Sequence, residues 1–210
     1  MTGNSVVILA ALAVPLFCFG SSHSLCDGHQ PAITVGVFNE AYIDEETLRN
    51  AELDTRKIFD SAGVRAIVQT VTGKFPSHPI ESENFLVRIV DRRPLHASPQ
   101  MLGFVASDPA SHIRYAAAYI PAVDRMAKAF ACDTHVVLGT VIAHEIGHLI
   151  LGPSHARKGI MHPQWDPLDF LLIKVNALEF TPAEAGRLRN DAGEFGSYRH
   201  ERRPAESTCP

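Results

Sequence analysis

A nearly continuous apolar segment of the chain carries three titratable side chains at a fixed spacing. Residues 136–143 (VVLGTVIA) are apolar almost throughout, and His144, Glu145 and His148 follow directly. A segment of this kind predicts a helix that is apolar nearly all round and therefore buried in the core. On a helix, residues four apart share a face, so the imidazoles of His144 and His148 point at one spot. Buried polar groups need partners, and this requirement constrains the fold more than any other feature of the sequence.

Two neutral imidazoles on one helix face suit Zn²⁺, which binds histidine nitrogens in tetrahedral sites. Glu145 stands next to the first histidine, and a carboxylate there can take a proton from a water molecule that a metal polarises. The alternative is a pair of core histidines that are hydrogen-bonded to the protein and bind no metal. Because a metal would satisfy both rings at once, the segment predicts a zinc site with a general base beside it.

The residues after this helix offer a third histidine. Gly152-Pro153 predicts the helix end, because glycine adopts positive φ and proline cannot continue the hydrogen-bond ladder. His155 follows the turn, and Gly-Ile-Met stands at 159–161. This stretch resembles the metzincin clan of zinc metalloproteases, whose signature is two helical histidines, a glutamate, a glycine turn, a third histidine and a methionine in a tight turn. The resemblance implies a general base at Glu145, a Met-turn at Met161 and three metal ligands, His144, His148 and His155.

The spacing departs from the usual signature by one residue. The clan places the glycine three residues and the third histidine six residues after the second histidine. Here Gly152 is four residues and His155 seven residues after His148. The separation between glycine and third histidine is unchanged, so the turn can be kept as a unit after a helix that is one residue longer. His162 is the nearest competing ligand, but it follows the turn methionine.

The resemblance extends through Trp165 to Phe180-Thr181-Pro182 and is closest to small bacterial metzincin-like proteins. It covers about the last 80 residues well and the first 100 in outline. It implies an α+β fold with a twisted mixed sheet and one long helix in the upper half. The active-site helix, the Met-turn and the C-terminal helices would form the lower half. The stretch directly after Met161 has no tyrosine of the kind that assists catalysis in some metzincins. Its large ring is Trp165, which we expect to line the substrate pocket.

The rest of the chain predicts the elements of such a fold. The β-branched and apolar runs predict five strands, at 33–38, 64–71, 85–90, 102–107 and 113–120. Helices are expected at 45–62 with Asp44 as N-cap, at 167–178 with Asp166 as N-cap, and from Pro182 to about 190 behind a Thr181-Glu184 capping box. Pro121 to Asp133 would lead into the active-site helix, and the tail from Gly193 would be loose.

Strand 102–107 has a particular place in the expected fold. In the clan, the strand in this position is the exposed edge beside the cleft. An extended peptide can add to such an edge by main-chain hydrogen bonds. An ordinary edge strand that binds nothing would give the same sequence pattern.

The N-terminus has the composition of an export signal. Residues 1–24 contain no Lys, Arg, Asp or Glu, and residues 6–20 are apolar apart from Pro15. That run is shorter than the roughly 20 residues of a membrane span. It predicts a signal peptide over 1–24, a mature start between residues 21 and 27, and a secreted or periplasmic protein. A retained N-terminal anchor is the alternative. The remainder, 25–210, is expected to form a single metzincin-like catalytic domain.

The cysteine content limits the disulfides that can form, and the net charge bears on the binding partners. Cys26, Cys132 and Cys209 follow the leader, so at most one internal disulfide can form. A Cys26–Cys209 pair and a latency switch formed by Cys26 on the zinc both remain open. A formal charge of −4 gives no sign of nucleic-acid binding. We expect a monomer that acts on a peptide or protein, with no nucleic-acid partner and no membrane partner after signal cleavage.

Together these features predict a zinc-dependent endopeptidase. Three protein ligands leave one position on Zn²⁺ for water, and Glu145 would take a proton from that water and pass it to the leaving amine. One alternative is a zinc peptidase whose third ligand is a glutamate on a later helix, Glu179 or Glu184. The other is a secreted, non-catalytic zinc-binding or interaction protein, although such a protein has no use for a base at Glu145.

Overall fold

The computed structural model describes residues 30–78, 80, 83–92, 97–98, 100–107 and 113–201, with side chains up to residue 193. The predicted leader, Cys26 and Cys209 lie outside these residues. Within them, Cys132 is a free thiol, and burial raises its pKa.

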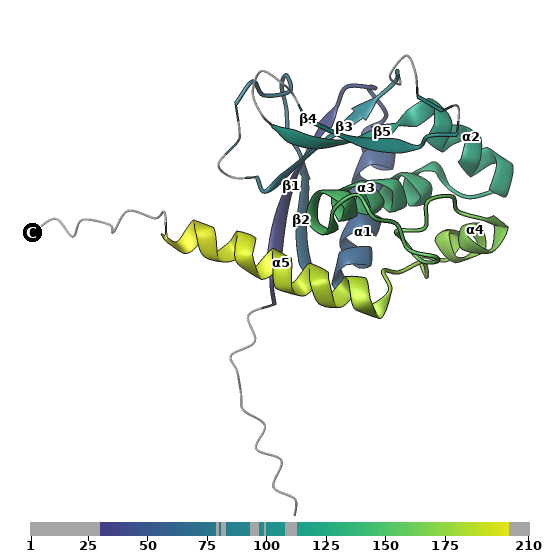
Figure 1. The fold of residues 1–210 in the computed structure, drawn as a ribbon. Helices are drawn as coiled ribbons and strands as arrows, with labels where there is room; N and C mark the ends of the chain where they lie inside the picture. The colour runs from purple at the N-terminus through teal and green to yellow at the C-terminus, as the bar shows by residue number, and fades with distance from the viewer. Residues whose placement is uncertain are drawn as a thin grey trace, which may run out of the picture.

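The described chain forms a five-stranded mixed sheet, with β3, β4 and β5 at the top of Figure 1 and β1 and β2 running down beside the helices. Its strand order is β2-β1-β3-β5-β4, and every neighbouring pair is parallel except β4 with β5. The expected twisted mixed sheet is therefore present, and β4 is an edge strand as predicted. The bounds of β3 (Phe85–Val90) are as expected, and no strand end differs from its expected position by more than one residue: β1 (Ala32–Asn39), β2 (Arg65–Thr70), β4 (Gly103–Ser107) and β5 (Arg114–Tyr119).

The first helix, α1 (Glu45–Ser61), begins and ends where the sequence predicted. Asp44 caps it by accepting a hydrogen bond from the Thr47 N–H at 2.8 Å. Gly63 follows at φ +78°, in the left-handed region that glycine adopts most readily. The buried face of α1 carries Leu48, Ile58 and Phe59 into the core.

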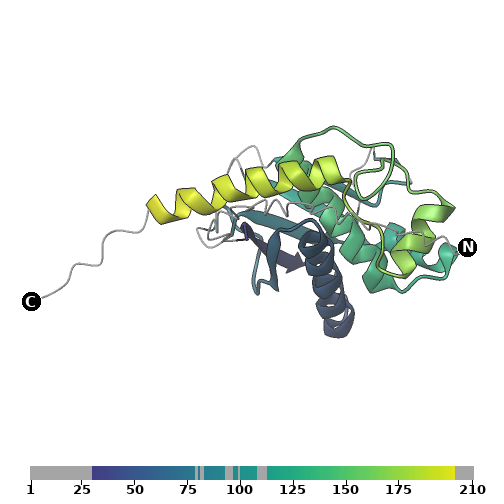
Figure 2. The same ribbon diagram turned by 90° about the horizontal axis from the view of Figure 1, so that it is seen from below.

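Helix α3 (Thr134–Leu151) is the central element of the lower half. It contacts the other four helices of the described chain as well as β3, β4 and β5. Figure 2 shows α5 (Pro182–Glu201) lying across it. By length and mean hydropathy α3 would pass as a membrane span, yet 72% of that stretch is buried inside the fold. The apolar sequence of this helix thus reflects its place in the core.

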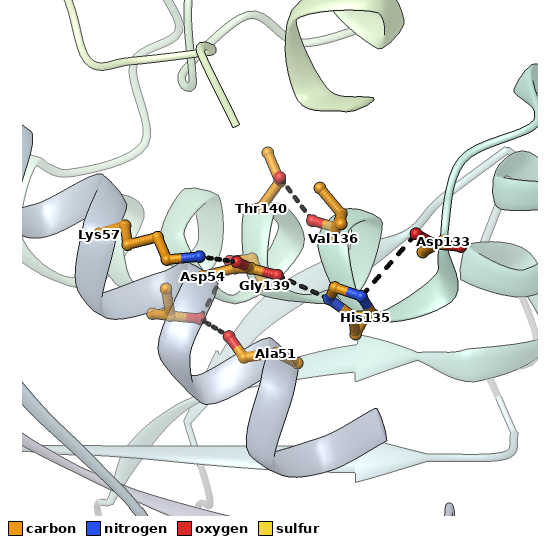
Figure 3. Close-up of polar contacts among 9 residues, drawn as sticks. Ala51, Asp54, Lys57, Asp133, His135, Val136, Gly139 and Thr140 are labelled. Atoms are coloured by element: carbon orange, nitrogen blue, oxygen red, sulfur yellow. Dashed lines mark hydrogen bonds and ion pairs between the residues drawn. The ribbon is translucent and has the colours of Figure 1, made fainter. Parts of the chain in front are cut away.

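The junction of α1 and α3 is unusually close (Figure 3). A Cβ atom on Gly139 would lie 2.8 Å from the Ala51 carbonyl oxygen and 2.9 Å from the Asp54 Cβ. The Thr55 hydroxyl lies within hydrogen-bonding distance of the carbonyl oxygens of both Ala51 and Gly139, at 2.9 and 3.1 Å. Lys57 lies 2.9 Å from the buried Asp54 carboxylate and forms an ion pair with it. This tight packing fixes the direction of α3 relative to α1.

The segment before α3 differs from the prediction. Residues 121–133 were expected to lead directly into the active-site helix, but they contain a separate helix, α2 (Ile120–Phe130). It ends at Ala131, which adopts a left-handed conformation at φ +50°. Asp133, whose backbone is extended, is the N-cap residue of α3. No glycine stands between the two helices, so the sequence pattern did not indicate that the helix would be interrupted there.

The two C-terminal helices also differ in length from the prediction. Helix α4 (Pro167–Lys174) ends four residues before the expected 178, because Asn176 turns into the left-handed region at φ +54°. Its N-terminus is as predicted, with Asp166 in a capping box. Helix α5 continues past the expected end near 190 to Glu201, so the prediction of a loose tail was wrong for residues 193–201, and the rest of that tail lies outside the described residues.

Candidate metal centre

The C-terminal end of α3 brings the predicted histidines together. His144 and His148 lie one turn apart on this helix, and the helix ends at Gly152, whose N–H donates to the His148 carbonyl oxygen at 3.1 Å. Gly152 has φ +89°, which a residue with a side chain rarely adopts. The chain reverses there and returns His155 to the other two rings. The predicted helix end at Gly152-Pro153 is confirmed.

The three imidazoles converge on one point. The Nε2 atom of His148 lies 3.1 Å from Nε2 of His144 and 3.2 Å from Nε2 of His155. One potential ligand atom from each of the three residues lies within 4.8 Å of those of the other two. A tetrahedral Zn²⁺ with bonds of roughly 2.0–2.1 Å would hold its nitrogen ligands about 3.3 Å apart. The three histidines could therefore hold a metal ion, although the geometry alone does not specify which ion.

Backbone carbonyl groups fix the orientation of two of the rings. Nδ1 of His144 donates to the Ile160 carbonyl oxygen at 2.6 Å, and Nδ1 of His148 donates to the Gly152 carbonyl oxygen at 3.0 Å. A carbonyl oxygen can only accept, so Nδ1 carries the hydrogen in both rings and Nε2 carries the lone pair. This arrangement is typical of metal-ligating histidines. The Trp165 indole also donates to the Ile160 carbonyl oxygen, at 3.2 Å, and its ring packs edge-on against His144.

The electrostatic environment favours neutral rings. The pKa of His144 is lowered to about 4, chiefly by burial and also by the neighbouring His148 and His155, against the opposing effect of the Ile160 hydrogen bond. The pKa of His155 is also lowered, first by partial burial and then by His148 and His162. Neutral imidazole is the form that binds a metal, so no proton has to be displaced from these two rings at neutral pH.

Glu145 lies under the edge strand β4. Its side chain is buried, and burial raises the pKa of its carboxyl group to about 8. A Cβ atom on Gly103 would lie 2.7 Å from both Cγ and Oε1 of Glu145 and 2.8 Å from the Ala117 carbonyl oxygen. Only glycine at this position of β4 leaves room for the carboxylate. The sequence analysis did not single out Gly103, although a glycine inside a strand often indicates close approach of another group.

Met161 lies in a tight turn packed against α3. The His162 N–H donates to the Gly159 carbonyl oxygen at 3.0 Å, which closes the turn, and Met161 itself is fully buried. A Cβ atom on Gly147 would lie only 2.5 Å from the Met161 sulfur. The turn therefore packs against α3 at Gly147, between the two helical histidines.

A cleft of about 590 Å³ opens beside the three histidines. Residues of the edge strand β4, of α3 and of the segment after Met161 line it. Trp165 lines the cleft, as predicted. Apolar side chains from several elements complete the lining, namely Leu102, Val105, Met126, Val141 and Phe170. The site combines a three-histidine cluster, a buried carboxylate and the edge strand β4 around one cavity.

The competing ligands have other partners. Nδ1 of His162 lies 2.7 Å from Oδ2 of Asp169, and the Glu184 carboxylate accepts hydrogen bonds from the N–H and the hydroxyl of Thr181 at 2.8 and 2.9 Å. Among the residues that the structure describes, the three histidines are the one group of three or more side chains placed to hold a metal ion, and Glu179 and Glu184 are not part of it.

The chain matches no protein-family model and no curated protein. Among solved structures it is similar to the crystal structure of metalloproteinase-II from Bacteroides fragilis, with a TM-score of 0.47 and 12% sequence identity. The match covers 78% of this chain and 54% of the Bacteroides protein, so the chain spans about half the length of that neighbour. A likeness this remote does not carry an activity over to this chain, and the functional argument rests on the site itself.

Proposed function

We propose that this chain is a zinc-dependent endopeptidase of the metzincin type. One observation carries the proposal: three histidine rings converge, with Nε2–Nε2 separations of 3.1 and 3.2 Å, in a cleft that also holds a buried carboxylate and an edge strand. His144, His148 and His155 are the proposed ligands, Glu145 the general base and Met161 the turn methionine. A secreted or periplasmic location, a cleavable leader and a monomeric state belong to the same proposal, and they rest on the sequence alone.

The residues of the chain have distinct tasks in this mechanism. Zn²⁺, when bound by the three histidines, supplies Lewis acidity that polarises a peptide carbonyl group and acidifies water. Glu145 accepts a proton from the attacking water and delivers it to the leaving amine. Burial alone raises the pKa of Glu145 to about 8, and a nearby cation favours the ionised form that the base needs. The unpaired edge of β4 would hold an extended peptide by main-chain hydrogen bonds.

The two alternatives fit the site less well. A structural zinc site is normally closed by four protein ligands, whereas three side chains converge here. A non-catalytic protein also gains nothing from an ionisable group buried beside the metal, since burying a carboxylate costs free energy. A glutamate as third ligand would require Glu184 to leave its cap on Thr181 or Glu179 to displace His155.

The test compares peptide turnover by the wild type and by Glu145→Gln at equal zinc content. The substitution keeps the size of the side chain and removes the proton acceptor, so turnover should fall by a factor of about 10² or more while zinc stays bound. Glu52→Gln is the matched control, because Glu52 is also a buried glutamate but lies on α1 and bonds to Thr70. Equal turnover by wild type and Glu145→Gln, or no zinc-dependent turnover of a broad peptide library by wild type, would refute the proposal.

A further inference from the structure

The fold contains two Asp–His pairs of the same geometry in different surroundings. Nδ1 of His162 lies 2.7 Å from Oδ2 of Asp169, and Nδ1 of His135 lies 2.7 Å from Oδ2 of Asp54. The exposed fractions of the side chains are also alike, at 23% and 10% for the first pair and 29% and 3% for the second. Figure 3 shows the second pair at the junction of α1 and α3, away from the cleft. Only the first pair faces the proposed active site.

His162 forms part of the cleft wall, together with His155 and Trp165. It follows Met161 directly, so the tight turn packed against Gly147 fixes where its backbone lies. No hydrogen-bond partner for its Nε2 lies within the part of the chain that the structure describes. A ring nitrogen is thus available to whatever occupies the cleft.

Asp169 holds this ring in place. Besides His162, its Oδ2 accepts a hydrogen bond from the Asp166 N–H at 3.0 Å, which ties the carboxylate to the first turn of α4. A carboxylate only accepts hydrogen bonds, so Nδ1 of His162 carries a hydrogen and Nε2 is the atom that remains for a substrate. Donation from Nε2 requires a ring that carries hydrogens on both nitrogens, with Nδ1 donating to Asp169.

We propose that His162 is a second catalytic residue and that Asp169 is its positioning residue. Nε2 of His162 donates a hydrogen bond to the carbonyl oxygen of the scissile peptide as negative charge builds on that oxygen. No proton leaves His162 in this step, because Glu145 carries the proton from water to the leaving amine. The inference rests on the proposed peptidase function and adds an imidazole donor on the lining of the cleft.

A purely structural role for His162 would resemble that of His135, and this similarity provides the control. His162→Leu and His135→Leu each remove both ring nitrogens, keep a side chain of comparable size and leave one aspartate without its histidine. We compare kcat and KM for a cleaved peptide at equal zinc content, together with the unfolding transition of each variant. For His162→Leu, kcat should fall by about 10² with little change in KM, the scale for loss of one oxyanion donor. For His135→Leu, kcat should stay at the wild-type value even if stability falls.

Asp169→Asn gives a second measurement that does not depend on whether His162→Leu folds. Asparagine keeps an oxygen that can accept from the Asp166 N–H but removes the charge that fixes the ring. We expect a smaller loss of kcat than for His162→Leu. In ¹⁵N spectra of the histidine rings in the metal-free protein, the signals of His162 should change and those of His135 should not.

The outcomes separate this inference from the proposed function. An active wild type with unchanged kcat in both His162→Leu and Asp169→Asn would overturn the role of His162 and leave the peptidase proposal intact. Equal losses of kcat in the His162 and His135 variants would likewise show a structural role only. A wild type that cleaves no peptide would overturn both the function and the inference.

Discussion

Gly139→Ala tests whether the close approach of α1 and α3 is as tight as the structure has it. The new methyl group would meet the Ala51 carbonyl oxygen at 2.8 Å, the Asp54 Cβ at 2.9 Å and the Thr55 nitrogen at 3.2 Å. Two of these are backbone atoms, which cannot rotate away as the end of a side chain can. Overpacking of this kind typically costs about 1–3 kcal/mol. Alanine recovers about 0.5–1 kcal/mol through its higher helix propensity. We therefore expect a net destabilisation of about 1–2 kcal/mol.

Gly186→Ala is the control for this prediction. Gly186 is also helical, but the nearest atom to its added Cβ is the Nη2 of Arg189 at 3.9 Å. Because no clash arises at this position, only the higher helix propensity of alanine acts, and it should stabilise the fold by about 0.5–1 kcal/mol. Denaturant unfolding of both variants measures the difference. If Gly139→Ala stabilises the fold as much as Gly186→Ala does, the helices are not packed as described and the reasoning fails.

Three further predictions concern the site and its support. His155→Ala should weaken zinc binding by more than about tenfold, whereas His162→Leu should not, and unchanged affinity in the alanine variant would remove His155 from the ligand set. Gly103→Ala should displace the Glu145 carboxylate, which lies 2.7 Å from the added Cβ, so peptide turnover should fall roughly tenfold or more at unchanged zinc content. Asp44→Ala removes an acceptor at 2.8 Å from an N–H in the first turn of α1, and that hydrogen bond holds the pKa of Asp44 below 3.8. The loss of stability should therefore be constant above about pH 5 and shrink as pH falls through the folded-state pKa, which unfolding curves at several pH values would check.

The sequence predicted those parts of the site that depend on local spacing. The i, i+4 separation placed His144 and His148 on one helix face, and the glycine and proline after the helix placed the turn that returns His155. Caps at Asp44 and Asp166 were predictable for the same reason, since a cap is a contact over three residues. Each of these features follows from backbone geometry within a few residues.

The features that escaped prediction arise from tertiary contacts. The pair between His135 and Asp54 joins residues 81 apart in the chain, and no local pattern indicates it. The approach of Gly103 to Glu145 likewise brings together a strand and a helix that are separated by β5 and α2. The break at Ala131 was missed because a left-handed alanine is held by the surrounding fold rather than favoured by its own propensity. Sequence spacing alone cannot supply such information.

The carbonyl contacts of the two helical histidines connect the site to the folding of the chain. His144 is bonded to Ile160 and His148 to Gly152, so both ends of the segment from 152 to 160 are tied to rings that would also hold the ion. An ion that binds the assembled rings and not the unfolded chain raises the free energy of unfolding by about 4 kcal/mol at a thousandfold excess over its Kd. The availability of the metal would then affect how long the segment from 152 to 160 stays folded and, under the proposed function, the rate of peptide turnover. In a cell or compartment poor in the ion, this segment would open more often and become easier for proteases to cleave.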